Sequence, residues 1–126
     1  MNNRGVGTQY ETLASMYLEE HGFKVLEKNF RSRDGEIDIV GRDGEFLVFV
    51  EVKYRATERK GMPEEAVGAA KQGRICRTAD YYRFVHRYSE DEPVRYDVIG
   101  ISGGEEVRIR WYKDAFPHVY RRQGGM

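Results

Sequence analysis

The segment Gly35–Arg55 constrains the fold more than any other part of the chain. It reads GEIDIVGRDGEFLVFVEVKYR, two β-rich runs separated by the tetrapeptide GRDG. Asp43-Gly44 suits a two-residue type I′ turn, which predicts a β-hairpin with Arg42 facing Glu45. Because side chains alternate along a strand, we expect one aliphatic face made of Ile37, Ile39, Val48, Val50 and Val52.

The opposite face of this hairpin mixes charged and apolar side chains: Glu36, Asp38, Val40, Leu47, Phe49, Glu51 and Lys53. A solvated outer face is one explanation. However, charges beside a covered apolar surface are costly unless they pair or bind something. In the predicted register Asp38 and Glu51 are diagonal neighbours, roughly 7–8 Å apart at the backbone. Carboxylate oxygens are preferred ligands of Mg²⁺ and Mn²⁺, so the pattern favours a metal site.

The order Asp38, then Glu51-Val52-Lys53, resembles the active-site pattern of the PD-(D/E)XK nuclease superfamily, which includes restriction enzymes and archaeal Holliday-junction resolvases. More closely, the segments GEIDIV, VFVEVK and DAF resemble the YraN-like family of uncharacterised bacterial proteins, which is placed in that superfamily. The resemblance extends from about Gly7 to Phe116. The proline that names the superfamily is Ile37 here, at a position that varies among its members.

The resemblance implies an α/β fold with a restriction-endonuclease-like core, a mixed sheet of about five strands flanked by an N-terminal helix and one long helix. It implies a Mg²⁺- or Mn²⁺-dependent endonuclease that hydrolyses phosphodiester bonds in DNA, including branched or structured DNA, in preference to RNA. A homodimer is a further expectation, as in the resolvases.

The same resemblance assigns roles to individual residues. Asp38 and Glu51 would hold the metal with the backbone carbonyl near Val52. Lys53 would orient or deprotonate the attacking water, or stabilise charge on the phosphate. The remaining candidates are the additional metal ligands Glu11 and Glu36, and Gln72 as a residue beside the metal.

Four further elements are predicted around the hairpin. Thr8 is expected to cap a helix that ends near Glu20, with Glu11 as its capping-box partner, a role that competes with metal binding. Phe23–Phe30 is predicted to be an edge strand. A long helix is expected from Pro63 to about Arg87, with Ile75, Ala79 and Tyr82 facing the core. Arg95–Ile101 and Val107–Tyr112 are predicted to form a second hairpin, with Val107, Ile109 and Trp111 on its inner face.

Basic residues gather in the second half of the chain, where residues 53–87 contain nine basic and four acidic side chains. Overall, 21 basic residues balance 21 acidic ones, which argues against a protein that coats nucleic acid indiscriminately. Arg31 and Arg33 are candidates for phosphate contact or for pairing with Asp34. The candidate nucleic-acid-binding residues are Arg31, Arg33, Arg55, Lys71 and Arg74.

Length and composition exclude several other classes. The 126 residues predict a single domain, with residues 1–7 and 118–126 as loose termini. Cys76 is the single cysteine, so an intramolecular disulfide is excluded, and the three histidines lack zinc-site spacing. The sequence shows no signal peptide or membrane-spanning run, which predicts a cytoplasmic protein without a membrane partner. Two rival functions remain: a catalytically silent nucleic-acid-binding module of the same fold, and a scaffold or assembly domain.

Overall fold

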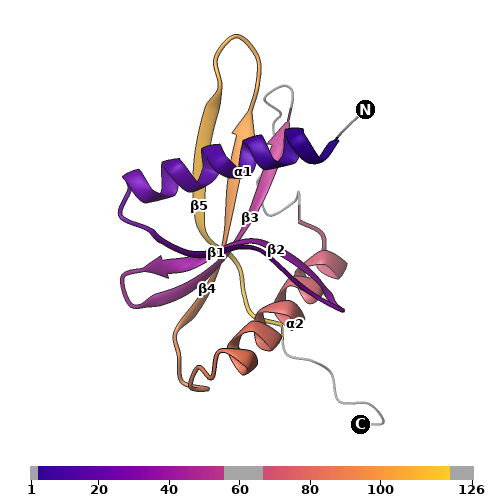
Figure 1. The fold of residues 1–126 in the computed structure, drawn as a ribbon, viewed down its shortest axis with the longest axis vertical. Coiled ribbons are helices and arrows are strands. Elements are labelled where there is room, and N and C mark those ends of the chain that lie inside the picture. The colour runs from indigo at the N-terminus through magenta and orange to yellow at the C-terminus, as the bar shows by residue number, and fades with distance from the viewer. Residues whose placement is uncertain (1–2, 56–66, 120–126) are drawn as a thin grey trace.

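The structure, a computed structural model, describes residues 3–55 and 67–119, with side chains from residue 9 onward. The elements follow the order α1 (Asn3–Glu20), β1 (Lys24–Ser32), β2 (Gly35–Asp43), β3 (Phe46–Arg55), α2 (Ala69–Val85), β4 (Val94–Ser102) and β5 (Arg108–Phe116). Figure 1 shows the two helices and the five-stranded sheet, with the β4–β5 hairpin extending past α1. The predicted α/β class, with a mixed five-stranded sheet and two helices, is confirmed.

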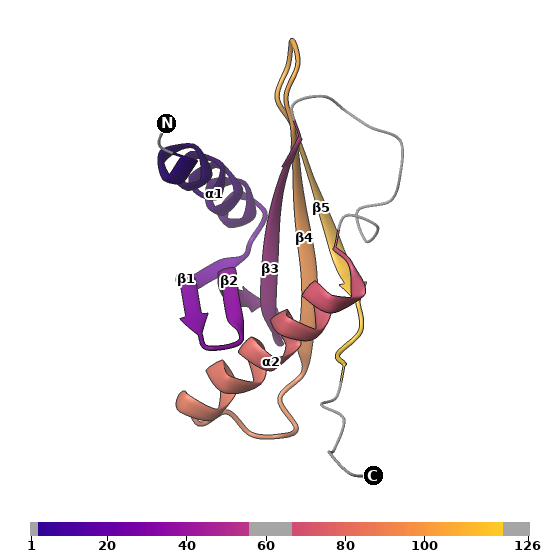
Figure 2. The same ribbon diagram turned by 90° about the vertical axis from the view of Figure 1, so that its right-hand side faces the viewer.

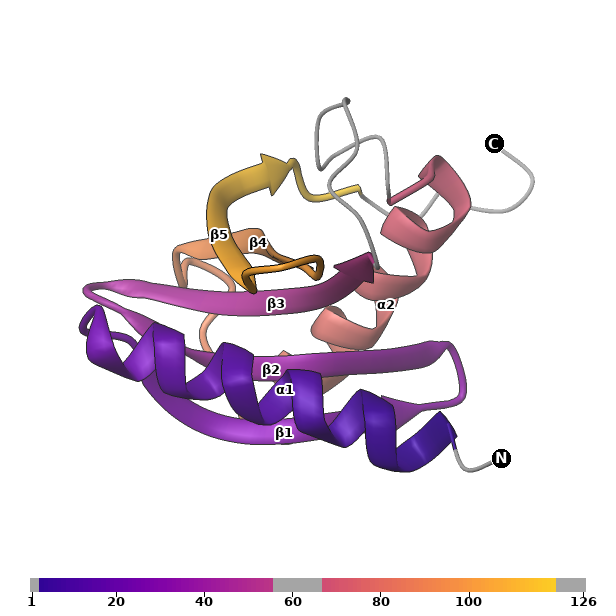
Figure 3. The same cartoon turned by 90° about the horizontal axis from the view of Figure 1, so that it is seen from above.

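The strands follow one another in the sheet in chain order, from β1 at one edge to β5 at the other. Only β3 and β4 are parallel, and the remaining neighbours are antiparallel. The helices cover opposite faces of the sheet (Figures 2 and 3). The cluster on the α1 side contains Ala14, Leu18, Phe23, Ile39, Val48, Val50, Ile99 and Ile101. The cluster on the α2 side includes Val40, Leu47, Phe49, Ile75, Ala79, Tyr82, Tyr96 and Val98.

The β2–β3 hairpin forms, but its register differs from the prediction by two residues. Asp43 pairs with Phe46, so Gly44 and Glu45 make the turn instead of Asp43 and Gly44. Gly44 has a φ of 60° and no non-glycine residue of this turn has a positive φ, so the turn resembles type II′ and not type I′. Asp43 stays in the strand, where its carboxylate lies 2.7 Å from the Arg95 guanidinium. A shift of two leaves the two faces of β3 as predicted.

The predicted face of Ile37 is wrong. Ile37 belongs to the α2-side cluster, whereas Ile39 packs on the α1 side. The β1–β2 ladder runs from Lys28↔Ile39 to Phe30↔Ile37 and omits the intervening pair. Asn29 in that gap has a φ of 56°, a conformation that interrupts regular pleating. The side-chain alternation of both strands is therefore broken beside Asp38.

Both helices begin elsewhere than predicted. α1 starts at Asn3, so Thr8 lies inside the helix and cannot be its N-cap, and residues 3–7 are helical instead of loose. α2 begins at Ala69 after Gly68, and the predicted start at Pro63 lies outside the described residues. The predicted core positions Ile75, Ala79 and Tyr82 are buried, which confirms the phase of this helix.

The second hairpin is confirmed as β4 and β5, and β1 is confirmed as an edge strand. Val107 precedes β5 and is 60% exposed, so its predicted inner position is wrong. Trp111 is part of the core, as predicted, and its Nε1–H donates to the fully buried Asp97 carboxylate at 2.8 Å. Within the described residues, no helix is long and apolar enough to cross a membrane.

Candidate functional site

Asp38 and Glu51 converge where β2 and β3 separate. The last ladder pair at this end is Ile39↔Val50, and one further step in the same register sets Asp38 opposite Glu51. There the Val52 N–H donates to the Asp38 carboxylate at 2.7 Å, where a ladder would have it donate to a backbone carbonyl. The corrected register therefore brings the two acids closer than the diagonal placement predicted from sequence.

The two acids lie at the edge of the α2-side core, where Glu51 is buried and Asp38 is half-buried. The Glu51 side chain is only 6% exposed, and Ile37, Phe49 and Ile75 border the space beside it. Burial and the charge of Glu51 raise the pKa of Asp38 from 3.8 to about 8, although the hydrogen bond from Val52 opposes this change. A weaker contribution comes from the charge of Glu11 on α1. At neutral pH this desolvated pair therefore favours a bound proton or a nearby cation.

Two lysines face the Glu51 carboxylate from different elements. Lys71 in the first turn of α2 places its Nζ 2.5 Å from Glu51 Oε2. Lys53, two residues after Glu51 on β3, places its Nζ 3.7 Å from the same oxygen. The ring of Tyr54 stacks on Tyr10 of α1 with centroids 3.9 Å apart, which anchors the end of β3 to α1 on the face opposite Lys53.

The two lysines differ in their proton affinity. Burial and the positive charge of Lys71 lower the pKa of Lys53, and the charge of Glu51 offsets part of this effect. Burial also acts to lower the pKa of Lys71, but its hydrogen bond to Glu51 and the charge of that carboxylate outweigh burial and raise it. Lys71 is therefore the permanent cation of the pair, and Lys53 is the amine that gives up its proton more easily.

The contact between Lys71 and Glu51 was missed by sequence reasoning, which assigned Lys71 to the nucleic-acid surface and Gln72 to the metal site. In the structure the Gln72 side-chain amide donates to the Val67 carbonyl at 2.8 Å. A lysine in a first helical turn opposes the helix dipole, and α2 has no acid in that turn. That unfavourable position is the one sequence signal for a buried carboxylate partner, and it becomes visible only once the helix start is known.

The additional predicted metal ligands do not complete a larger acidic cluster. Glu36 pairs with Arg31 at 3.6 Å on the surface of the β1–β2 hairpin. Glu11 influences the pKa of Asp38 but is not part of a compact ligand set. In the described part of the chain, no three His, Cys, Asp or Glu side chains lie close enough to hold a metal ion. Among the described residues, the carboxylates that converge for a cation are therefore the pair Asp38 and Glu51.

The other predicted nucleic-acid-binding residues lie on two sides of this pair. Arg33 is exposed in the β1–β2 turn, and Arg74 of α2 lies against that turn, beside Gly35. Asp34, a suggested partner of Arg31 and Arg33, instead lies 3.4 Å from Arg77. Arg55 is exposed at the end of β3. Positive charge thus flanks the carboxylates at the β1–β2 turn and at the end of β3.

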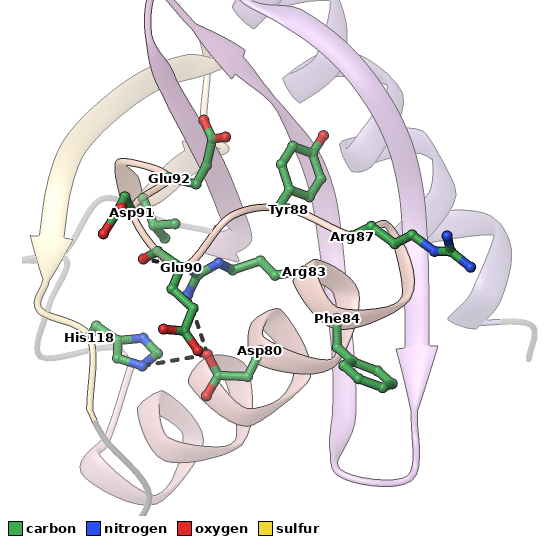
Figure 4. A pocket seen from close by; sticks show the side chains of 10 residues that line it. Asp80, Arg83, Phe84, Arg87, Tyr88, Glu90, Asp91, Glu92 and His118 are labelled. Carbon is green, nitrogen blue, oxygen red and sulfur yellow. Dashed lines mark hydrogen bonds and ion pairs between the residues drawn. The ribbon is translucent and has the colours of Figure 1, made fainter.

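A separate open cleft of about 850 Å³ lies at the carboxyl end of α2 (Figure 4). Three of the side chains that line it interact: Asp80 lies 3.6 Å from Arg83 and 3.5 Å from His118. The Tyr96 hydroxyl and His118 Nδ1 are 2.7 Å apart, which holds the end of the described chain against β4. Neither Asp38 nor Glu51 lines this cleft, so it is not part of the carboxylate site.

Comparison with known proteins shows the family of the chain. Residues 10–101, which contain Asp38, Glu51, Lys53 and Lys71, match the uncharacterised protein family UPF0102. A UPF0102 protein of Lachnoclostridium phytofermentans is 49% identical over 116 residues, covering 92% of this chain and 96% of the relative. UPF0102 proteins of Syntrophus aciditrophicus and Geobacter metallireducens are 44% and 43% identical over 121 residues, each covering 95% of this chain and 94% and 98% of the relative. The chain therefore belongs to the UPF0102 family, which corresponds to the YraN-like resemblance seen in its sequence.

Proposed function

We propose that the protein is a Mg²⁺- or Mn²⁺-dependent endonuclease that hydrolyses phosphodiester bonds in DNA. The observation that carries the proposal is the convergence of the half-buried Asp38 carboxylate and the buried Glu51 carboxylate beside the Lys53 amine. The arrangement of Asp38 on one strand and Glu51-x-Lys53 on the next is the one expected for the PD-(D/E)XK superfamily.

The residues present fit a hard divalent cation. Two carboxylates are enough for Mg²⁺, which commonly takes one or two protein carboxylates and completes its shell with water and substrate phosphate oxygens. The pKa of Asp38 is raised because its carboxylate is desolvated and lies beside the charge of Glu51, and a cation would offset both effects. Asp38, Glu51 and the backbone carbonyl of Val52 would hold the ion. When bound, the ion would polarise the scissile phosphate and lower the pKa of a water molecule.

The two lysines have different parts in the proposed reaction. Lys53, whose pKa is lowered, would accept or share the proton of the attacking water at its Nζ. Lys71 keeps its proton and holds Glu51 in position through the 2.5 Å ion pair. The low exposure of Glu51 limits competing water at the same carboxylate.

Cleavage of DNA tests the proposal. Wild type, Asp38→Asn and Lys53→Met would be incubated with supercoiled, single-stranded and branched DNA in Mg²⁺, in Mn²⁺ and in EDTA. We expect metal-dependent cleavage by the wild type and a loss of at least about 100-fold in each variant, the usual effect of removing a general base or charge stabiliser. Glu36→Gln is the control, because it removes a hairpin carboxylate paired only with exposed Arg31. Equal cleavage by Lys53→Met and wild type would exclude this mechanism.

One observation favours a different function, a silent nucleic-acid-binding module. The Lys71 amine already neutralises Glu51 at 2.5 Å, so the network balances part of its charge without an ion. Titration with Mn²⁺ separates the two functions. A nuclease site gives saturable binding that Asp38→Asn removes, whereas a silent module binds DNA equally with and without the ion. A scaffold domain would bind neither.

A further inference from the structure

The face of the sheet beside Lys53 continues as two rows of residues across β3, β4 and β5. In the first row Lys53 pairs with Gly100, and Gly100 pairs with Arg110. In the second row Arg55 pairs with Ser102, and Ser102 pairs with Arg108. Each row thus places a cation on both sides of a small residue.

The packing of neighbouring residues shows on which face these rows lie. Val98 and Tyr112 belong to the α2-side cluster, whereas Ile99, Ile101, Ile109 and Trp111 belong to the α1-side cluster. Because side chains alternate along a strand, Gly100 and Arg110 lie on the α2 side, as Lys53 does. The two rows therefore adjoin the carboxylates on one continuous face.

Helix α2 leaves this part of the face uncovered. α2 packs chiefly over β2 and β1, and Figure 2 shows the β4–β5 hairpin continuing beyond it. Arg55, Arg108 and Arg110 are exposed, while Lys53, Gly100 and Ser102 are half-buried. The two acidic residues of the hairpin loop, Glu105 and Glu106, follow the end of β4 and lie beyond the second row.

Gly100 has no structural explanation in the packing of the described residues. It lies inside a strand paired on both sides, where glycine weakens the strand, and it is not among the positive-φ glycines. A Cβ atom built there would meet only the Tyr112 ring, at an ordinary contact distance of 3.6 Å. A glycine inside a strand often marks a bulge, a bend or a close approach of a ligand or another backbone; both ladders are in register at Gly100, which favours the close approach.

We propose that the Lys53–Gly100–Arg110 row, together with Arg55 and Arg108 of the second row, is a binding site for the sugar–phosphate backbone of a nucleic-acid strand. Neighbouring strands are about 4.8 Å apart, so the backbones of Lys53 and Arg110 are separated by roughly 10 Å. In the metal-free protein the two cations at this separation can each contact a phosphate, and the bare Gly100 lets the sugar–phosphate chain pass between them. The inference rests on the proposed function and adds the direction of the substrate strand, from the carboxylates across β4 to β5.

DNA binding measured without metal tests this binding site separately from cleavage. The probe is a short fluorescein-labelled single-stranded DNA, with a duplex of the same sequence as a second arm, followed by anisotropy in EDTA at several salt concentrations. Gly100→Val fills the open position with a side chain that strands favour, so folding is retained. Arg110→Gln removes one cation, and Arg87→Gln, an exposed arginine beyond α2, is the matched charge control.

We expect both test variants to bind the probe about 10-fold more weakly than Arg87→Gln, with melting temperatures within a few degrees of wild type. Arg110→Gln should also reduce the slope of log K against log salt by about 0.7, the value for one phosphate contact on single-stranded DNA. If both variants bind as tightly as Arg87→Gln, or if wild type binds neither DNA, the proposed binding site is refuted. If wild type binds DNA and the variants do not, but no metal ion supports cleavage, the binding site is supported and the nuclease proposal fails.

Discussion

Asp38→Asn should make the protein more stable at alkaline pH. In the folded protein, burial and the Glu51 charge raise the pKa of Asp38 to about 8, from 3.8 for the unburied side chain. Between these values the folded state holds a proton that the unfolded state has released. The contribution of Asp38 to stability is therefore fully present below about pH 4, declines as pH rises, and is lost above about pH 8. Asparagine mimics the protonated acid at every pH and retains an oxygen to accept the Val52 N–H.

The size of the effect follows from the pKa. A change from 3.8 to about 8 sets a ceiling of about 6 kcal/mol on the cost of ionising Asp38 in the fold. Lys53 and Lys71 compensate part of the ionised pair, so we expect a gain of about 2–3 kcal/mol at pH 9, or roughly 10 °C in melting temperature. Wild type and Asp38→Asn should be almost equally stable only at or below about pH 4, and at pH 5 roughly a quarter of the difference expected at pH 9 should already be present.

Thermal and urea unfolding from pH 5 to pH 9 in EDTA would measure this difference. Asp34→Asn is the control, since it removes a half-exposed carboxylate of the β1–β2 turn that pairs with Arg77 of α2, and it should not reproduce the gain in stability at pH 9. Parallel curves for Asp38→Asn and wild type, or a variant less stable than wild type at pH 9, would refute the electrostatic reasoning. Added Mn²⁺ should stabilise wild type at pH 8 and leave Asp38→Asn unchanged.

Four further outcomes are expected. Binding of Mn²⁺ at pH 7 should release close to one proton per ion, because Asp38, with a pKa of about 8, is protonated at this pH and must lose its proton to bind the ion. Calorimetry in two buffers of different ionisation enthalpy measures the number of protons released. Release of no proton would contradict this prediction. Gly41→Ala should cost about 3 kcal/mol or more in urea unfolding, because its Cβ would collide with the Phe23 ring and the Lys24 carbonyl. Gly73→Ala is its counterpart and should instead add about 0.5–1 kcal/mol, because it lies in a helix and meets only the flexible end of Arg77. Trp111→Phe should cost about 1–3 kcal/mol, because the buried Asp97 loses a donor; stability equal to wild type would show that the bond from Trp111 is dispensable.

The strength of the sequence lay in local periodicity. The alternation in Phe46–Arg55 placed Phe49, Glu51 and Lys53 on one face, and the structure has them there. The hairpin partner was harder to place, because GRDG offers two glycine turns, and the choice depends on Asp43 reaching Arg95 from 52 residues away. Such a contact between distant residues leaves no mark in the hairpin itself.

The composition of the site shows the same division. Asp38, Glu51 and Lys53 could be identified because they lie within one short stretch of sequence. The sequence could not decide whether Lys71 or the adjacent Gln72 faces Glu51, because a difference of one residue turns a helical side chain by about 100°. In the structure Lys71 contacts Glu51, and Gln72 donates to the Val67 carbonyl instead. The role of Gly100 depends on the parallel pairing of β3 with β4, which no local pattern predicts.

The single parallel junction between β3 and β4 also sets the order in which the site can assemble. Asp38 and Glu51 are joined by a short hairpin, whereas Lys53 and Gly100 are separated by most of the second half of the chain. Closing the longer loop costs roughly 1 kcal/mol more in chain entropy, and non-local pairing is slow. During folding the acidic pair is thus brought together first, and Lys71 and the arginines of β5 join it later. A nascent chain that ends before α2 would therefore contain the repelling carboxylates without the amine that neutralises Glu51.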